Sequence, residues 1–186
     1  MWEWSKTNPS TKKSSLYRVY NDLPSKKQTN PKESLDNKIL SPSDMQDFLQ
    51  KKITELNLKN ISLKECTYHP YTWSNMLKYF DNYQQIRNKF LKFLGYSCQK
   101  ECLDIGLNAD DIELLKEGIS PENYNTHIKI PFDFGGSLEF ENLCLIKTRS
   151  SHYKIHYLIE HQIGSCFLQQ HKIIYIPWFE GHIYHE

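Results

Sequence analysis

The sequence predicts an α+β fold, in which a mainly helical N-terminal part is followed by a C-terminal module of short strands and one helix. Apolar residues recur at helical spacing between residues 41 and 105. After Gly118, short strand-like segments flank a Gly-Gly turn signal, and a segment with helical spacing follows them. Seven of the eight histidines come after residue 126. We therefore expect a weakly ordered basic tail (1–40), a helical region (41–105) and a C-terminal module (106–186).

The predicted tail, residues 1–40, is rich in Ser, Asn, Pro and Lys and has little apolar surface to bury. It holds eight Lys and Arg residues against four acidic ones, so its formal charge is 8 − 4 = +4. Both a solvated tail and an arm that contacts nucleic-acid phosphates fit this composition. We expect weak order in either case.

The first predicted helix begins at Ser41, which suits an N-cap because Pro42 follows it and Asp44 falls in the first turn. It is expected to run to about residue 56 or 58, and residues 59–70 are expected to connect it to the next helix.

The second predicted helix spans about residues 72–94, with Gly95 as its stop. Its aromatic stripe fits a buried core better than a ligand surface. A short helix or turn is expected at residues 98–105, and a further helix from Asn108 to Lys116, ended by Gly118.

Composition excludes some classes of protein. No stretch has the roughly 18 to 20 apolar residues of a membrane span. The N-terminus lacks the apolar segment of a secretory signal, so we expect a cytoplasmic protein or one exported by a route without an ordinary signal peptide. The odd number of cysteines, five, favours free thiols in a reducing compartment. The formal charge of +1 excludes a large uniform basic field but allows a local basic site.

The C-terminal module carries the residues most suited to chemistry. His152 and His156 are four residues apart, so on a helix they lie on one face and can bind one ion together. Such a pair alone is a weak signal. A third imidazole from a neighbouring hairpin would complete an open three-ligand site, and His127 stands where that hairpin would begin.

This module resembles the HNH (ββα-metal) nuclease modules of bacteriocins and polymorphic toxins. The resemblance covers residues 106–186. It rests on His127 before Lys129-Ile130-Pro131, the Gly135-Gly136 turn, Phe140-Glu141-Asn142-Leu143 and the His152–His156 pair, in that order. Each piece is common alone, and the ordered series is fairly specific. The resemblance implies a toxin or effector that hydrolyses phosphodiester bonds, with DNA favoured over RNA.

The resemblance also implies residue roles. His127, His152 and His156 match the ligands of one divalent ion, with Zn, Ni, Mg and Mn as candidates. Asn142 matches the central Asn of the motif, which ties the active-site loop through backbone hydrogen bonds and so orients the catalytic residue. An immunity or host protein would be a further partner. Four basic residues lie close in sequence to the site and are expected to contact the nucleic acid: Lys129, Lys147, Arg149 and Lys154.

The chain departs from the family pattern at Ile128, which occupies the position of the histidine that acts as general base. Placing His127 there instead would lose the hairpin ligand and break the register with Pro131. Three outcomes stay open. The metal could act without a base, another residue (Lys129, Glu160 or His161) could replace it, or the module could have lost cutting activity.

Two other functions compete with a nuclease. The basic tail, the aromatic helices and the missing base also fit a catalytically inactive scaffold that binds protein or nucleic acid as an effector. The three histidines could alternatively form a closed structural zinc site with Cys144 or His161 as the fourth ligand, because structural sites have four protein ligands.

Overall fold

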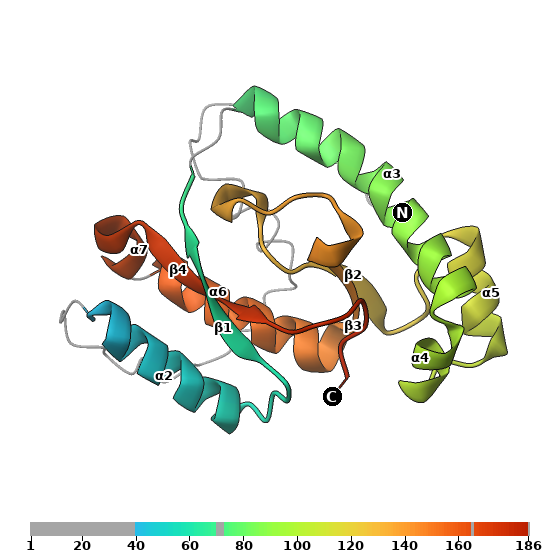
Figure 1. The fold of residues 1–186 in the computed structure, drawn as a ribbon, viewed down its shortest axis with the longest axis horizontal. Helices are drawn as coiled ribbons and strands as arrows, with labels where there is room; N and C mark the ends of the chain where they lie inside the picture. The colour runs from blue at the N-terminus through green and yellow to red at the C-terminus, as the bar shows by residue number, and fades with distance from the viewer. Residues whose placement is uncertain (1–39, 70–72, 165, 186) are drawn as a thin grey trace, which may run out of the picture. The chain divides into compact units, whose positions relative to one another are not determined.

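The computed structural model describes residues 40–69, 73–164 and 166–185, in which helices and strands are mixed, as predicted for an α+β fold. The predicted tail lies outside the described residues except for Leu40. No described helix is both long and apolar enough to span a membrane. The main elements (Figure 1) are α2 (Pro42–Glu55), β1 (Ser62–Thr67), α3 (Trp73–Ser97), α4 (Gln99–Asp104), α5 (Ala109–Glu117), β2 (Tyr124–Ile128), β3 (Leu143–Lys147), α6 (Tyr153–Gly164), α7 (Cys166–His171) and β4 (Ile173–Trp178).

The ends of α2 and α5 follow the local signals in the sequence. Ser41 caps α2, its side chain accepting from the backbone N–H of Asp44 in a reciprocal capping box. Asn108 caps α5 in the same way, with Asp111 as its partner. Gly118 ends α5 in the left-handed conformation, with φ of 82°, which glycine adopts without steric cost. The predicted starts of both helices and the stop at Gly118 are confirmed.

The predicted stop of α3 at Gly95 is wrong, because the helix continues to Ser97. Gly95 serves close packing instead. A Cβ atom at this position would lie 2.6 Å from the backbone nitrogen of Lys116 and 2.9 Å from the carbonyl carbon of Leu115. Its missing side chain therefore lets α3 approach the backbone of α5, and the two helices pack along each other.

The first sheet joins two strands that are far apart in the sequence. β1 pairs antiparallel with β4, from Ser62 opposite Trp178 to Thr67 opposite Ile173. β1 lies within the segment predicted as a connector, and neither strand was expected. The ladder also crosses the boundary predicted between the helical region and the C-terminal module, and the described residues form one compact unit.

The second sheet is the β2–β3 hairpin, in which Tyr124 pairs with Lys147 and Ile128 with Leu143. Alternate side chains of a strand point to opposite faces. One face, with Ile128 and Leu143, packs against α3 and α5 in the main hydrophobic core. His127 and its partner Cys144 therefore lie on the other face. The hairpin thus separates the core from the histidines.

Helix α6 follows a π-helical turn at Thr148–His152 and packs against β4. The buried side chain of Gln162 joins them, donating to the carbonyl of Tyr175 at 2.8 Å and accepting from its backbone N–H at 2.7 Å. A buried amide with both ends paired fixes position and register. Gln162 was not singled out from the sequence, since its role depends on a partner from a strand that was not predicted.

Candidate metal centre

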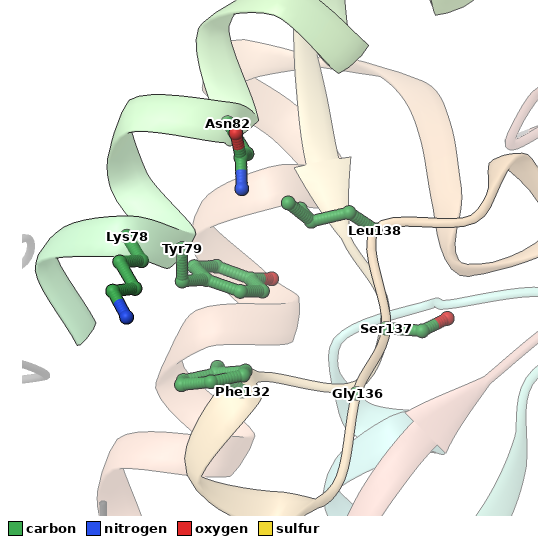
Figure 2. Close-up of a pocket in the computed structure, with 7 residues that line it drawn as sticks. All are labelled: Lys78, Tyr79, Asn82, Phe132, Gly136, Ser137 and Leu138. Carbon is green, nitrogen blue, oxygen red and sulfur yellow. The ribbon is translucent and has the colours of Figure 1, made fainter. Parts of the chain in front are cut away.

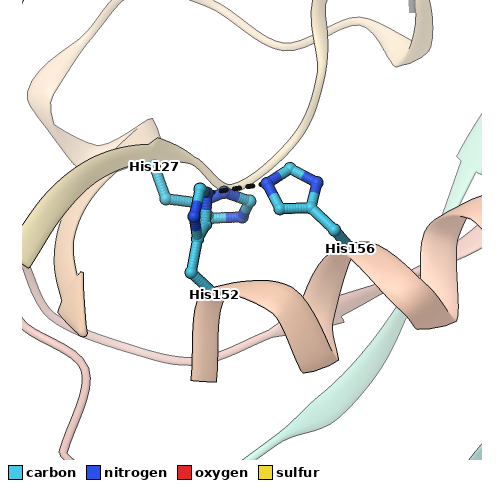
Figure 3. Close-up of side chains that lie close together, drawn as sticks. All are labelled: His127, His152 and His156. Carbon is cyan, nitrogen blue, oxygen red and sulfur yellow. Dashed lines mark hydrogen bonds between the residues drawn. The ribbon is translucent and has the colours of Figure 1, made fainter. Parts of the chain in front are cut away.

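Three imidazoles converge between the hairpin and the following helix (Figure 3). His127 comes from β2, His152 from the end of the π-helical turn, and His156 from the first turns of α6. Their potential ligand atoms all lie within 4.8 Å of one another. The Nε2 atoms of His152 and His156 are 2.7 Å apart and share a hydrogen bond. We call these residues the histidine cluster, and it could hold a metal ion.

The histidine cluster follows from simple local geometry. The four-residue spacing of His152 and His156 places both rings on one side of the helical segment. Strand alternation turns His127 away from the hydrophobic core and toward that segment. The ring centroid of His127 lies 5.1 Å from that of His152 and 4.9 Å from that of His156.

Burial keeps the three rings neutral. Desolvation lowers the pKa of His127 well below its usual value, and the neighbouring His156 and His152 lower it further. Burial likewise lowers the pKa of His152 to about 4 and that of His156 to about 3. Near pH 7 all three therefore offer a lone pair, as metal ligation requires. The buried Nε2 atom of His127 has no hydrogen-bond partner within the described residues, which is unusual for a buried polar atom.

The donor set fits a borderline ion such as Zn²⁺ or Ni²⁺, for which imidazole nitrogen is a suitable ligand. Nitrogen ligands about 2.0–2.1 Å from a tetrahedral ion lie about 3.3 Å from one another. The 2.7 Å separation of His152 and His156 is shorter than this. Ligation would therefore replace their mutual hydrogen bond and move the two nitrogens apart by about 0.6 Å, which small ring rotations can supply.

Neither proposed fourth ligand belongs to the histidine cluster. Cys144 lies opposite His127 in the ladder, but its sulfur is not among the grouped ligand atoms. Burial raises the pKa of its thiol to about 12, so it is protonated rather than a ready thiolate. His161 stacks on Phe48 of α2 with ring centroids 4.7 Å apart. Among the described residues, the candidate centre thus offers three potential protein ligands, the number found in open sites.

Ile128 faces away from the histidine cluster. Its side chain is part of the packing against the core that contains Phe90, Leu91 and Leu143. In this regular strand, alternate side chains point to opposite faces, and Ile128 points to the core while His127 points to the cluster. The apolar residue at this position therefore suits its surroundings.

The loop between β2 and β3 is tied at both ends by Asn142. Its side chain accepts from the backbone N–H of Ile130 at 2.8 Å and donates to the carbonyls of Ile130 and Ser137, both at 2.9 Å. Gly136 permits this arrangement, because a Cβ atom there would collide with the carbonyl oxygen of Ile130. The loop that leaves His127 is thereby held to the start of β3.

Lys129 does not lie where a nucleic-acid contact would need it. Its side chain is only 2% exposed, and its Nζ donates to the carbonyl of Gly181 at 2.7 Å. The ammonium also lies 4.8 Å from the ring centroid of Trp178 and 5.2 Å from that of Phe179. This burial contradicts the predicted surface contact. Lys129 instead anchors the strand end that carries His127 to the C-terminal segment.

The other predicted contacts lie nearer the surface. Arg149 is exposed, while Lys147 and Lys154 are half-buried. Arg149 stands in the π-helical turn and Lys154 in the first turn of α6, so both flank the ligand-bearing segment. Glu160, one of the alternative bases, is exposed by its surface area, and partial desolvation of its carboxyl raises the pKa. Neither Glu160 nor Lys129 belongs to the histidine cluster.

A cavity of about 350 Å³ lies between α3 and the β2–β3 loop (Figure 2). Tyr79 and Phe132 stack along one side of it, with ring centroids 4.1 Å apart. Gly136 and Ser137, on the opposite side, belong to the loop that Asn142 ties. None of the three histidines lines this cavity, so it is separate from the candidate centre.

Comparison with known proteins gives one partial similarity. No protein family's sequence profile matches the chain, and no solved structure matches it. A stretch of 45 residues, 24% of this chain, is 44% identical to part of the uncharacterized protein YhhZ of Escherichia coli strain K12. That stretch covers 12% of YhhZ. The similarity to this uncharacterized protein assigns no activity to the chain.

Proposed function

We propose that the chain is an HNH-type metal-dependent nuclease that hydrolyses phosphodiester bonds, with DNA as the favoured substrate. The observation that carries the proposal is the convergence of the buried His127 with the half-buried His152 and His156, whose rings are neutral and whose potential ligand atoms lie within 4.8 Å of one another. The order of motifs around them, which resembles HNH modules, supports the same reading. A role as a toxin or effector with an immunity or host partner rests on that resemblance alone.

A bound divalent ion would supply a Lewis acid that polarises the scissile phosphate and offsets charge on the leaving oxygen. The chain's own residues position the reaction. Asn142 holds the loop that follows His127, and the Lys129 ammonium fixes the strand end. Arg149 and Lys154 flank the site at the surface and would contact phosphates on either side of the scissile bond.

The histidine base of related modules has no counterpart at Ile128, whose side chain faces the core. Loss of a positioned base lowers a rate by about 10² to 10⁴. We therefore propose a slow nuclease whose attacking water is activated without a histidine at this position. The sequence-based alternative Lys129 is unsuited to that task, because its Nζ donates to the carbonyl of Gly181.

The test is incubation of purified protein with supercoiled plasmid and Mg²⁺, Mn²⁺, Ni²⁺ or Zn²⁺, alongside metal analysis. We expect slow nicking, about one ion per chain, and loss of both in His127→Ala and His156→Ala. His185→Ala is the matched control, because His185 is exposed and lies outside the histidine cluster. Nicking that survives His127→Ala would show that the site assignment is wrong.

A metal-stabilised binding scaffold is the second candidate, and the orientation of Ile128 favours it. A protein that is no longer selected for nuclease activity can keep its metal-ligand histidines while the residue at the general-base position, here Ile128, packs into the hydrophobic core. This candidate also predicts one ion per chain and a higher unfolding temperature with metal. It differs in predicting no nicking with any of the four ions while nucleic acid still binds.

A further inference from the structure

Two tyrosines stand on the exposed side of the helix that carries a cluster histidine. Tyr153 and Tyr157 directly follow His152 and His156 in the sequence, and they are 41% and 43% exposed. Large apolar rings with this exposure are few among the described residues. The ring centroid of Tyr153 lies 6.3 Å from that of His152, so the exposed rings begin at the histidine cluster itself.

The aromatic surface continues beyond these tyrosines. The ring centroids of Tyr157 and His161 are 6.2 Å apart, and His161 stacks on Phe48 of α2 at 4.7 Å. We call Tyr153, Tyr157, His161 and Phe48 the aromatic strip. Its helical part, from Tyr153 to His161, is about 12 Å long at 1.5 Å per residue. That length matches about three stacked nucleotides at roughly 3.4 Å each.

The charges beside the aromatic strip favour an anionic partner at the end that carries Tyr153, next to the histidine cluster. Arg149 is exposed just before the strip, and Lys154 is half-buried next to Tyr153. Within the described residues neither forms an ion pair. Glu160 is the acidic residue of α6 and follows Tyr157 by three positions. On α6 and the turn before it, positive charge therefore lies at the end that carries Tyr153, nearest the histidine cluster.

We propose that the aromatic strip binds the unpaired bases of a single nucleic-acid strand and so delivers the phosphate beside them to the histidine cluster. The proposal rests on the proposed nuclease function and specifies its substrate as single-stranded or locally unpaired. Tyr153 and Tyr157 stack on the bases, while Arg149 and Lys154 contact the backbone. Surfaces that combine aromatic rings with basic side chains bind single strands in this way.

The choice of a single strand follows from which parts of a nucleic acid are accessible. Tyrosine rings gain stacking energy from the faces of bases, and every base has such a face. In a duplex these faces are covered by neighbouring pairs, and only the base edges and the backbone are exposed. Two exposed rings one helical turn apart therefore have little to stack on in duplex DNA.

The test uses the full chain and a short oligonucleotide that carries 2-aminopurine and a hydrolysis-resistant phosphorothioate backbone. The fluorescence of 2-aminopurine falls when the base stacks, so binding and stacking are read together. We expect the native protein to quench the fluorescence of the single strand. We also expect its affinity for the matching duplex to be at least tenfold lower than its affinity for the single strand. Tyr153→Ala and Tyr157→Ala should each weaken single-strand binding by about tenfold, whereas Tyr153→Phe and Tyr157→Phe should retain it.

Tyr96→Ala is the matched control, because Tyr96 is 66% exposed on α3 and should leave binding unchanged. Quenching of a DNA or an RNA strand supports the proposal and identifies the favoured sugar. Equal affinity for strand and duplex, or alanine variants that bind like the native protein, would overturn it. Stacking without cleavage of an unmodified single strand in the presence of the four metal ions would instead count against the nuclease function alone, so the two failures are distinguishable.

Discussion

Replacing Asn142 with alanine should both destabilise the protein and weaken metal binding. The buried side chain forms three hydrogen bonds, two with the backbone of Ile130 and one with the carbonyl of Ser137. Alanine removes all three and leaves the backbone groups of the loop without these partners. Because the loop leaves the strand that carries His127, its release also loosens one metal ligand.

The magnitude follows from the number of bonds. A hydrogen bond contributes about 1 kcal/mol net, so three give a loss of about 3 kcal/mol in the free energy of unfolding. Loss of a residue that supports a metal ligand indirectly typically costs about 10- to 100-fold in metal affinity. Asn142→Asp keeps the acceptor but points a carboxylate oxygen at two carbonyl oxygens, so near pH 7 it should be no better than alanine.

Urea unfolding followed by tryptophan fluorescence, in EDTA, measures the stability of the metal-free protein, and a competing chelator measures its affinity for Zn²⁺. Asn108→Ala is the control, because Asn108 caps α5 and its loss should cost about 1 kcal/mol with metal affinity unchanged. If Asn142→Ala loses less than about 1 kcal/mol and binds Zn²⁺ normally, the loop is held by something other than these bonds.

Two further predictions concern packing and protonation. Gly95→Ala should lower the free energy of unfolding in urea by about 1–3 kcal/mol, because its methyl group would collide with the backbone of Lys116 and Leu115. An unchanged urea midpoint would mean that α3 and α5 are farther apart than the structure shows. The metal-free protein should lose stability as the pH falls from about 6.5 toward 4. The unfolded histidines gain protons in this range, while the folded pKa values of His152 and His156 are about 4 and 3. Urea midpoints at pH 7.5, 5.5 and 4.5 measure this, and an equal decline in a His152→Ala, His156→Ala double variant would contradict it.

The sequence predicted the features that depend on neighbouring residues. The capping boxes at Ser41 and Asn108 act over three residues, so their signals are local. The same is true of the His152–His156 spacing and of the hairpin on either side of the Gly-Gly turn. The predicted hairpin start at His127 also made this residue a candidate third ligand, and the structure places it beside the pair.

Features that depend on distant partners were not predictable in this way. β1 has an irregular burial pattern, with only Cys66 buried, so it lacks the alternation by which a strand is recognised. The role of Gly95 depends on the backbone of α5, and that of Lys129 on Gly181. A lysine in a basic segment is usually solvated, and nothing nearby indicates that the C-terminal segment covers this one.

The β1–β4 ladder also governs when the site can form during synthesis. The Ser62 hydroxyl donates to the carbonyl of Trp178, 116 positions away. At about 5–20 residues per second, β1 waits about 6–23 s for its partner to be made. Gln162 joins α6 to Tyr175 of that same late strand. A growing chain that has passed His156 therefore carries all three histidines before it has the strand that packs against α6, and the candidate metal site is complete only once β4 has been made.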